Sequence, residues 1–203
     1  MKFKQLFAHF REMKHFFIAT AMVFAIGIFV GYEYSANFAD YLQGGLEKLK
    51  PINDFVNTKD NPQLWLFIII FLNNASIAIM VIFLGMIFGL LPLFMLVSNG
   101  MILGYALSLN TTGSTGLLVL KGILPHGIFE ISAILIACAY GLKLGTLMMK
   151  LCLHVLIRRV GATARPEFIR IFKLLLPLIT FIVILLLIAA TVESTLSYWL
   201  MKV

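Results

Sequence analysis

Charged residues are scarce in this chain, and that scarcity excludes a soluble globular fold. Only 12% of the 203 residues are Asp, Glu, Lys or Arg, about half of what soluble domains carry, whereas 61% are hydrophobic. The mean hydropathy is +1.00. No charged residue occurs between Asp60 and Lys121, and no hydrophilic stretch is long enough for a separate soluble domain. The sequence therefore predicts an integral membrane protein.

Cysteines and catalytic motifs are equally sparse. The two cysteines, Cys138 and Cys152, lie in or just after one apolar segment, where we interpret them as small hydrophobic residues rather than as a disulfide or a metal site. The sequence lacks HExxH, a glycine-rich phosphate loop, and any serine, cysteine or paired-aspartate motif for proteolysis. We therefore predict that the protein is not an enzyme and binds no cofactor.

The basic residues cluster in two places, Lys2 to Lys14 and Lys150 to Lys173, whereas residues 32–63 are more acidic than basic. Because cytoplasmic loops are enriched in Lys and Arg, both basic regions and the N-terminus are expected inside. The loop 32–63 and the C-terminus are then expected outside, in a bacterial cell membrane. The net charge of +7 thus reflects membrane topology rather than nucleic-acid binding.

Apolar runs predict an all-α, polytopic membrane protein with about five transmembrane helices and short interfacial helices. The expected order is a cytoplasmic interfacial helix at 1–15, spans at 16–31, 64–88, 93–109, 126–147 and 174–199, an external loop at 32–63, an interfacial segment at 117–124 and a basic cytoplasmic loop at 148–173. The first run is interpreted as a retained span, because it is long for a signal-peptide core and the residues that follow make a poor cleavage site. Pro125 is expected in the first turn of the fourth span.

The uncharged region 64–109 must turn inside the membrane or at its edge, because about 20 residues suffice for one crossing. The preferred turn is Gly89-Leu90-Leu91-Pro92. The alternative is Ser98-Asn99-Gly100, which would leave a short re-entrant second arm.

Glycines spaced four residues apart recur in the apolar runs. Such pairs let helix backbones approach closely in lipid, either within one chain or against another membrane protein. The expected packing positions are Gly27, Gly31, Gly85, Gly89, Gly100, Gly104, Gly127, Gly141 and Gly145.

A few polar residues interrupt the spans, and burying ionisable groups there requires a structural or functional reason. His126 and Glu130, four residues apart at the start of the fourth span, share one helix face. The expected polar intramembrane site consists of His126, Glu130, Asn73, Asn74, Asn99 and Glu193. These side chains are expected to converge on one cavity that opens outward, although the asparagines alone would also serve to bridge helices. A metal site of His126, Glu130 and Glu193 is disfavoured, because only one histidine lies in that half of the membrane.

Several of these motifs together resemble the stage II sporulation protein M family. They are Asn73-Asn74, Ser98-Asn99-Gly100, the run from Pro125-His126-Gly127 through Glu130 to Ala133, and Gly141-Leu142-Lys143-Leu144-Gly145. The resemblance implies a bacterial membrane scaffold for engulfment during endospore formation. It also implies two peptidoglycan-degrading partners, the sporulation proteins D and P, while the family member is not itself the hydrolase. The family has members in organisms that do not sporulate.

Two functions therefore remain open. A scaffold would bind its partners through the outer loop 32–63 and the glycine-lined helix faces. The alternative is a small-solute or ion permease or channel with an outward-facing polar site at His126 and Glu130. The chain is short for a transporter and shows no clear inverted repeat, so this alternative requires a homo-oligomer. An intramembrane hydrolase ranks last, since neither a nucleophile nor a metal-ligand set is evident.

Overall fold

A computed structural model describes residues 2–36, 58–109, 115–156 and 164–200 of the chain. Within these residues there are six helices and no strand, so the all-α fold class is confirmed. The helices are α1 (Lys2–Glu12), α2 (Lys14–Glu33), α5 (Pro62–Leu84), α6 (Leu90–Leu109), α7 (Thr115–Leu156) and α8 (Ala164–Leu200).

Five of these helices are long and apolar enough to cross a membrane, which confirms the polytopic membrane fold. The apolar segments are Lys14–Glu33, Pro62–Leu84, Leu90–Ser108, Gly127–Leu153 and Ala164–Thr195. Helix α5 begins with Pro62, which suits the first helical position because that backbone nitrogen needs no hydrogen-bond partner. Many large apolar side chains remain exposed, as expected for helices whose outer faces meet lipid rather than water.

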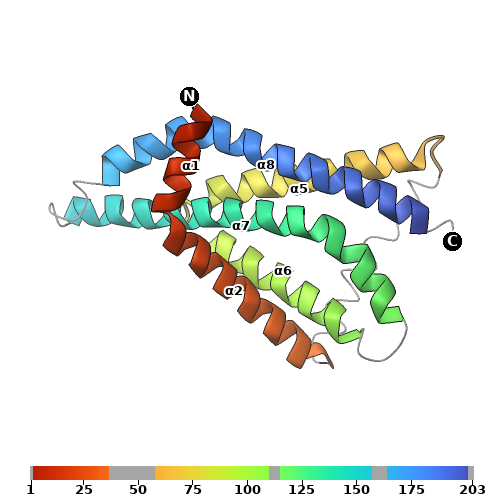
Figure 1. Ribbon diagram of the computed structural model, residues 1–203. Helices are drawn as coiled ribbons and strands as arrows, with labels where there is room; N and C mark the ends of the chain where they lie inside the picture. Colours follow the sequence, from red (N-terminus) through yellow and green to blue (C-terminus); the bar gives the residue numbers. More distant parts are fainter. Residues whose placement is uncertain (1, 37–57, 110–114, 157–163, 201–203) are drawn as a thin grey trace.

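The spans form two packed groups. Helix α2 packs most extensively on α6, and α7 packs most extensively on α8, with α5 against both α7 and α8. Figure 1 shows the α2–α6 pair diverging from α8 toward the end where α8 finishes, while the first part of α7 bends toward the end of α6. We call that end, which contains residues 58–63 and 191–195, the far end. The basic end comprises α1, residues 143–156 and residues 164–173.

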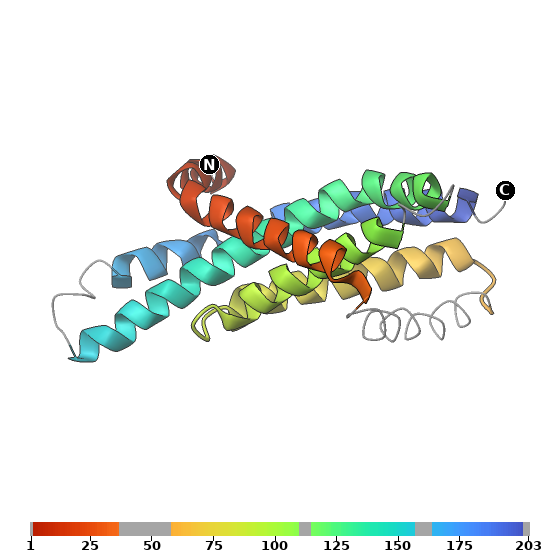
Figure 2. The same ribbon diagram turned by 90° about the horizontal axis from the view of Figure 1, so that it is seen from below.

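Helix α1 lies across the bundle rather than along it. It runs across α7 and α8 in Figure 1 and is seen nearly along its axis in Figure 2, whereas α2 runs with the other spans. The predicted interfacial segment at 1–15 is thus helical from Lys2 to Glu12. Its buried face carries Leu6, His9 and Met13, while Phe3 and Phe7 are exposed. The interfacial helix is therefore fastened to the protein and not only to lipid.

Glycines bring α2 and α6 into backbone contact. A Cβ added at Gly27 would lie 2.8 Å from the carbonyl oxygen of Val97 and 3.1 Å from Cα of Gly100. A Cβ added at Gly31 would overlap the backbone of Met101, and one added at Gly104 would overlap the carbonyl of Ile28. The two glycine pairs therefore face each other within one chain.

A second glycine contact joins the end of α5 to α7. A Cβ added at Gly85 would overlap Gly141, and one added at Gly145 would lie 2.6 Å from the carbonyl oxygen of Gly85. All four glycine pairs are thus used in packing within the chain. This corrects the expectation that glycine-lined faces are available to a partner, because the opposing backbone already occupies them.

The uncharged region turns at residues 85–89, and α6 begins at Leu90. Phe88 and Gly89 adopt positive φ angles of 53° and 74°, which close the turn. Ser98, Asn99 and Gly100 lie inside α6, so the alternative turn there does not occur. Ile87 and Phe88 are exposed at the tip, which therefore suits hydrocarbon better than water.

The structure corrects two boundaries at the other helices. Residues 117–124 are not a separate interfacial segment and Pro125 does not start a helix, because α7 is continuous from Thr115 to Leu156. The basic loop predicted at 148–173 is largely helical, since α7 continues to Leu156 and α8 already begins at Ala164. Backbone N–H and C=O groups inside a membrane need hydrogen-bond partners, which a continuous helix supplies. An interior proline therefore bends the helix without ending it. Figure 1 shows such a bend in the green part of α7.

Candidate functional site

A cavity of about 150 Å³ lies between α2, α6 and α7. Two polar side chains face it, Asn99 from α6 and Glu130 from α7, and the rest of the lining is apolar or glycine. The lining residues are Phe24, Asn99, Ile102, Leu103, Ala106, Gly127, Glu130, Ile131 and Ile134. Two members of the predicted polar site are therefore brought together from separate helices.

The helices explain the positions of these two side chains. The Asn99 amide donates a hydrogen bond of 2.8 Å to the carbonyl oxygen of Met95, one turn earlier on α6, so its side-chain oxygen remains to accept from the cavity. Gly127 is buried one turn before Glu130 on α7. Because glycine has no side chain, it leaves space in the cavity beside the carboxyl group. His126 belongs to α7, but its side chain lies outside the described residues. The cavity can accept hydrogen bonds from a small polar group.

Asn73, Asn74 and Glu193 of the predicted polar site do not line this cavity. Asn73 and Asn74 lie on α5, where the Asn73 amide donates a hydrogen bond of 3.3 Å to the side-chain oxygen of Asn74. Glu193 is half-buried on α8. Of the five described members of the predicted polar site, only Asn99 and Glu130 therefore meet at one cavity.

No cluster of three or more His, Cys, Asp or Glu side chains able to hold a metal ion occurs within the four described ranges. Cys138 is buried, whereas Cys152 is exposed on α7 and does not fit the expectation of a buried hydrophobic residue. The polar groups that the cavity presents are the Asn99 amide and the Glu130 carboxyl group.

A wider pocket of about 550 Å³ opens at the far end, between the start of α5 and the end of α8. Six of its nine lining residues are polar: Asp60, Asn61, Gln63, Thr191, Ser194 and Thr195 accompany Pro62, Leu64 and Phe67. Asn61 precedes α5 without a capping hydrogen bond from its side chain. Sequence reasoning missed this pocket, because its two walls are separated by more than 120 residues.

Comparison with known proteins identifies the family. The family model for stage II sporulation protein M matches residues 20–198. The chain belongs to this family. It is also 30% identical, over 89% of its length, to an uncharacterized protein of Methanocaldococcus jannaschii, of which the match covers 93%. No solved structure matches the chain.

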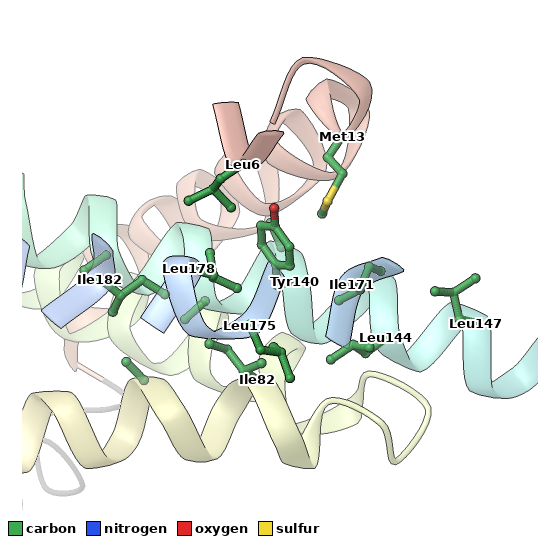
Figure 3. Packing of buried hydrophobic residues seen from close by; sticks show 14 of the residues in the cluster. Leu6, Met13, Ile82, Tyr140, Leu144, Leu147, Ile171, Leu175, Leu178 and Ile182 are labelled. Atoms are coloured by element: carbon green, nitrogen blue, oxygen red, sulfur yellow. The ribbon is translucent and has the colours of Figure 1, made fainter. Parts of the chain in front are cut away.

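The match to the stage II sporulation protein M family begins after α1, so α1 itself lies outside the matched residues, whereas the residues of α7 and α8 that hold it lie within them. The buried His9 ring and the Tyr140 hydroxyl form a hydrogen bond of 2.9 Å between α1 and α7. Figure 3 shows the hydroxyl pointing toward α1, between Leu6 and Met13. Rings of Phe10 and Phe181 pack beside it, with centroids 5.9 Å apart.

Ion pairs surround this hydrogen bond at the basic end. The Arg170 guanidinium on α8 donates two hydrogen bonds, of 2.7 and 2.8 Å, to the Glu12 carboxylate on α1. Lys143 of α7 pairs with Glu167 of α8 and also lies over the Phe16 ring, 5.2 Å from its centroid. Lys143 therefore joins α7 to α8.

The surroundings of α1 shift the pKa values of two of its side chains, His9 and Glu12. Burial, assisted by the nearby Arg170 and Lys143 charges, lowers the pKa of His9 from its usual 6.5, against the opposing effect of Glu12 and Glu167. The hydrogen bonds from Arg170 lower the pKa of Glu12. Neutral His9 and ionised Glu12 are therefore the forms that stabilise docking of α1.

Docking of α1 is expected to weaken as the pH falls. Because the pKa of His9 is lower in the docked form than its usual 6.5, its contribution is fully present above pH 6.5 and is lost as the pH falls through the docked value. Trypsin cleavage at Lys4 and Arg11 should therefore be slower at about pH 8 than at about pH 5.5, after correction for the pH dependence of trypsin on an unfolded substrate. His9→Gln retains polar atoms but does not titrate, so it should abolish the pH difference. An equal pH difference in His9→Gln would contradict this role.

Proposed function

We propose that this protein is a non-enzymatic membrane scaffold that anchors peptidoglycan-degrading partner proteins. The process and the partner class come from the family resemblance, in which the sporulation proteins D and P are held during engulfment in endospore formation. The observation that carries the proposal is the polar pocket of about 550 Å³ at the far end. It lies where the loop 32–63 joins α5, and so next to the segment expected to meet extracytoplasmic proteins.

The distribution of charge supports an orientation that places this pocket outside a bacterial cell membrane. Lys150, Arg165, Arg170 and Lys173 lie at the basic end, whereas Asp60 lies at the far end. Under the positive-inside rule the basic end and the N-terminus face the cytoplasm, and the C-terminus lies outside. A cell-wall hydrolase outside the membrane would then meet the pocket directly.

The pocket suits a protein segment better than an apolar ligand. Asp60, Asn61 and Gln63 offer carboxylate and amide groups on one side, while Thr191 and Thr195 use their hydroxyl hydrogens for bonds to carbonyls of α8. Leu64 and Phe67 add an apolar floor. A partner protein that presents hydrogen-bond donors where its chain leaves the membrane would complement these polar acceptors and the apolar floor.

The scaffold proposal is tested by purifying the tagged, full-length protein from native membranes and identifying co-purifying proteins by mass spectrometry. Thr195→Arg places a bulky cation in the pocket and should reduce recovery of cell-wall hydrolases at least about tenfold, as expected when a central contact is blocked. Cys152→Arg, at an exposed position on α7 at the basic end that does not line the pocket, is the control and should retain them. Equal recovery with both variants, at matched membrane levels, would count against the pocket.

Glu130→Gln separates the scaffold from the permease alternative. If Glu130 holds α6 and α7 in one arrangement, the variant should lose stability and partner recovery together. In a permease, the variant should change pH-dependent solute flux in proteoliposomes while recovery of partners remains unchanged. Flux through the wild-type protein in the absence of partners would favour the second function.

A further inference from the structure

Helix α5 exposes polar side chains in the middle of a span. Asn73 is the twelfth of the 23 residues of α5, and it is exposed, as is Ser76 three residues later. No charged residue lies on α5, so neither side chain is near a polar end of the helix. A helix of this length just crosses the hydrocarbon, so Asn73 lies near the centre of the bilayer.

These side chains belong to a continuous exposed stripe. Asn73, Ser76, Met80 and Leu84 follow one another at helical spacing, and all four are exposed. The opposite side of α5 carries Ala75, Ala78 and Ile82, which are buried against α7 and α8. The stripe therefore points away from the bundle.

The polar atoms of the stripe are not fully satisfied by the part of the chain that the structure describes. The Asn73 amide donates to Asn74, but among the described residues no donor reaches the side-chain oxygen of Asn73 and no partner reaches the hydroxyl of Ser76. Lipid tails offer no hydrogen bonds, and an unpaired amide in hydrocarbon is costly. Asparagine and serine are also residues that join helices in membranes.

We propose that the α5 stripe is the interface with a second copy of this chain. Two copies inserted in the same direction and related by a twofold axis along the membrane normal place Asn73 opposite Asn73 at the same depth. An amide both donates and accepts, so the pair is self-complementary. The stripe carries no charge, so two copies do not repel each other. A different partner would need its own polar side chain at that depth.

The first test is disulfide cross-linking of the full-length protein in membranes, with Cys138→Ala and Cys152→Ser as background. Met80→Cys, in the stripe, should cross-link to a second copy at least tenfold faster than Leu176→Cys, an exposed position on α8. Ile82 and Leu175 are neighbours in the antiparallel helices α5 and α8 (Figure 3), so Met80, two residues farther from the basic end, and Leu176, one residue farther, lie at similar depth. Equal rates, or a product that contains another protein, would overturn the proposal.

The second test measures the role of the amide with labelled protein in liposomes. Energy transfer between copies is followed as lipid is added, which gives a dimer dissociation constant. Asn73→Leu should raise this constant about three- to twentyfold, the range for an interhelical hydrogen bond in a membrane, while Asn73→Gln and Ile184→Leu should not. An unchanged constant for Asn73→Leu, or a wild-type protein that is monomeric at every dilution, would refute the interface. No cell-wall partner is present, so the result is independent of the proposed scaffold role.

Discussion

Replacing Gly104 with leucine is expected to separate α2 from α6. A Cβ at this position would lie 2.8 Å from the backbone nitrogen of Tyr32 and would overlap the carbonyl oxygen of Ile28. Backbone cannot move aside as a flexible side chain does, so the two helices must shift apart. The expected loss is at least about 3 kcal/mol of unfolding free energy.

Equilibrium unfolding of purified protein in mixed micelles measures this loss. Ile102→Leu, an exposed position on the same helix, is the control and should remain near the wild type. A glycine in a helix normally costs about 0.5–1 kcal/mol relative to alanine. Gly104→Ala should nevertheless destabilise the protein, and a gain in stability would contradict backbone contact at this crossing.

Replacing Tyr140 with alanine is expected to release α1 and to loosen the basic end. The Tyr140 side chain is fully buried, bonds to His9 and packs on the ring of Phe10 at a centroid distance of 6.0 Å. Truncation of a buried aromatic side chain costs about 3–5 kcal/mol, because a cavity remains. The cavity here would lie between α1, α7 and α8.

Tyr140→Phe separates the hydroxyl from the ring. This variant keeps the packing but leaves the buried His9 nitrogen without its partner, and about 1–3 kcal/mol should be lost. The exposed Tyr34→Phe is the control and should have no effect. Both losses should appear as unfolding free energy and as faster trypsin cleavage of α1. Wild-type protection of α1 in Tyr140→Ala would show that the ion pair between Glu12 and Arg170 suffices for docking.

Helix α1 shows how much of the structure could be predicted from the sequence of a single helix. The sequence predicted an interfacial helix at 1–15, and a helix is present from Lys2 to Glu12. The buried face, however, centres on Leu6, His9 and Met13, because α7 offers Tyr140 as a hydrogen-bond partner for a histidine. A histidine three residues from a leucine and four from a methionine was the available signal, but its partner lies 131 residues away.

The polar site shows the same limit. The sequence identified Asn99 and Glu130 as intramembrane polar residues, and the two line one cavity. It grouped Asn73, Asn74 and Glu193 with them, although these side chains lie on α5 and α8. Depth in the membrane follows from position along the chain, whereas the direction of a side chain around its helix depends on which helices surround it.

The sequence by itself determined that the chain lies in a membrane, that about five helices cross it, and where close helix contacts were available. These properties follow from local quantities: the transfer of apolar residues into lipid, the length of a helix and the size of glycine. Only the tertiary structure decided that Gly27 and Gly31 meet Gly100 and Gly104, that Gly85 meets Gly141, and that the face bearing Asn73 stays uncovered. The physical reason is that a transmembrane helix is apolar all round, so hydrophobic periodicity cannot distinguish the side that meets protein from the side that meets lipid.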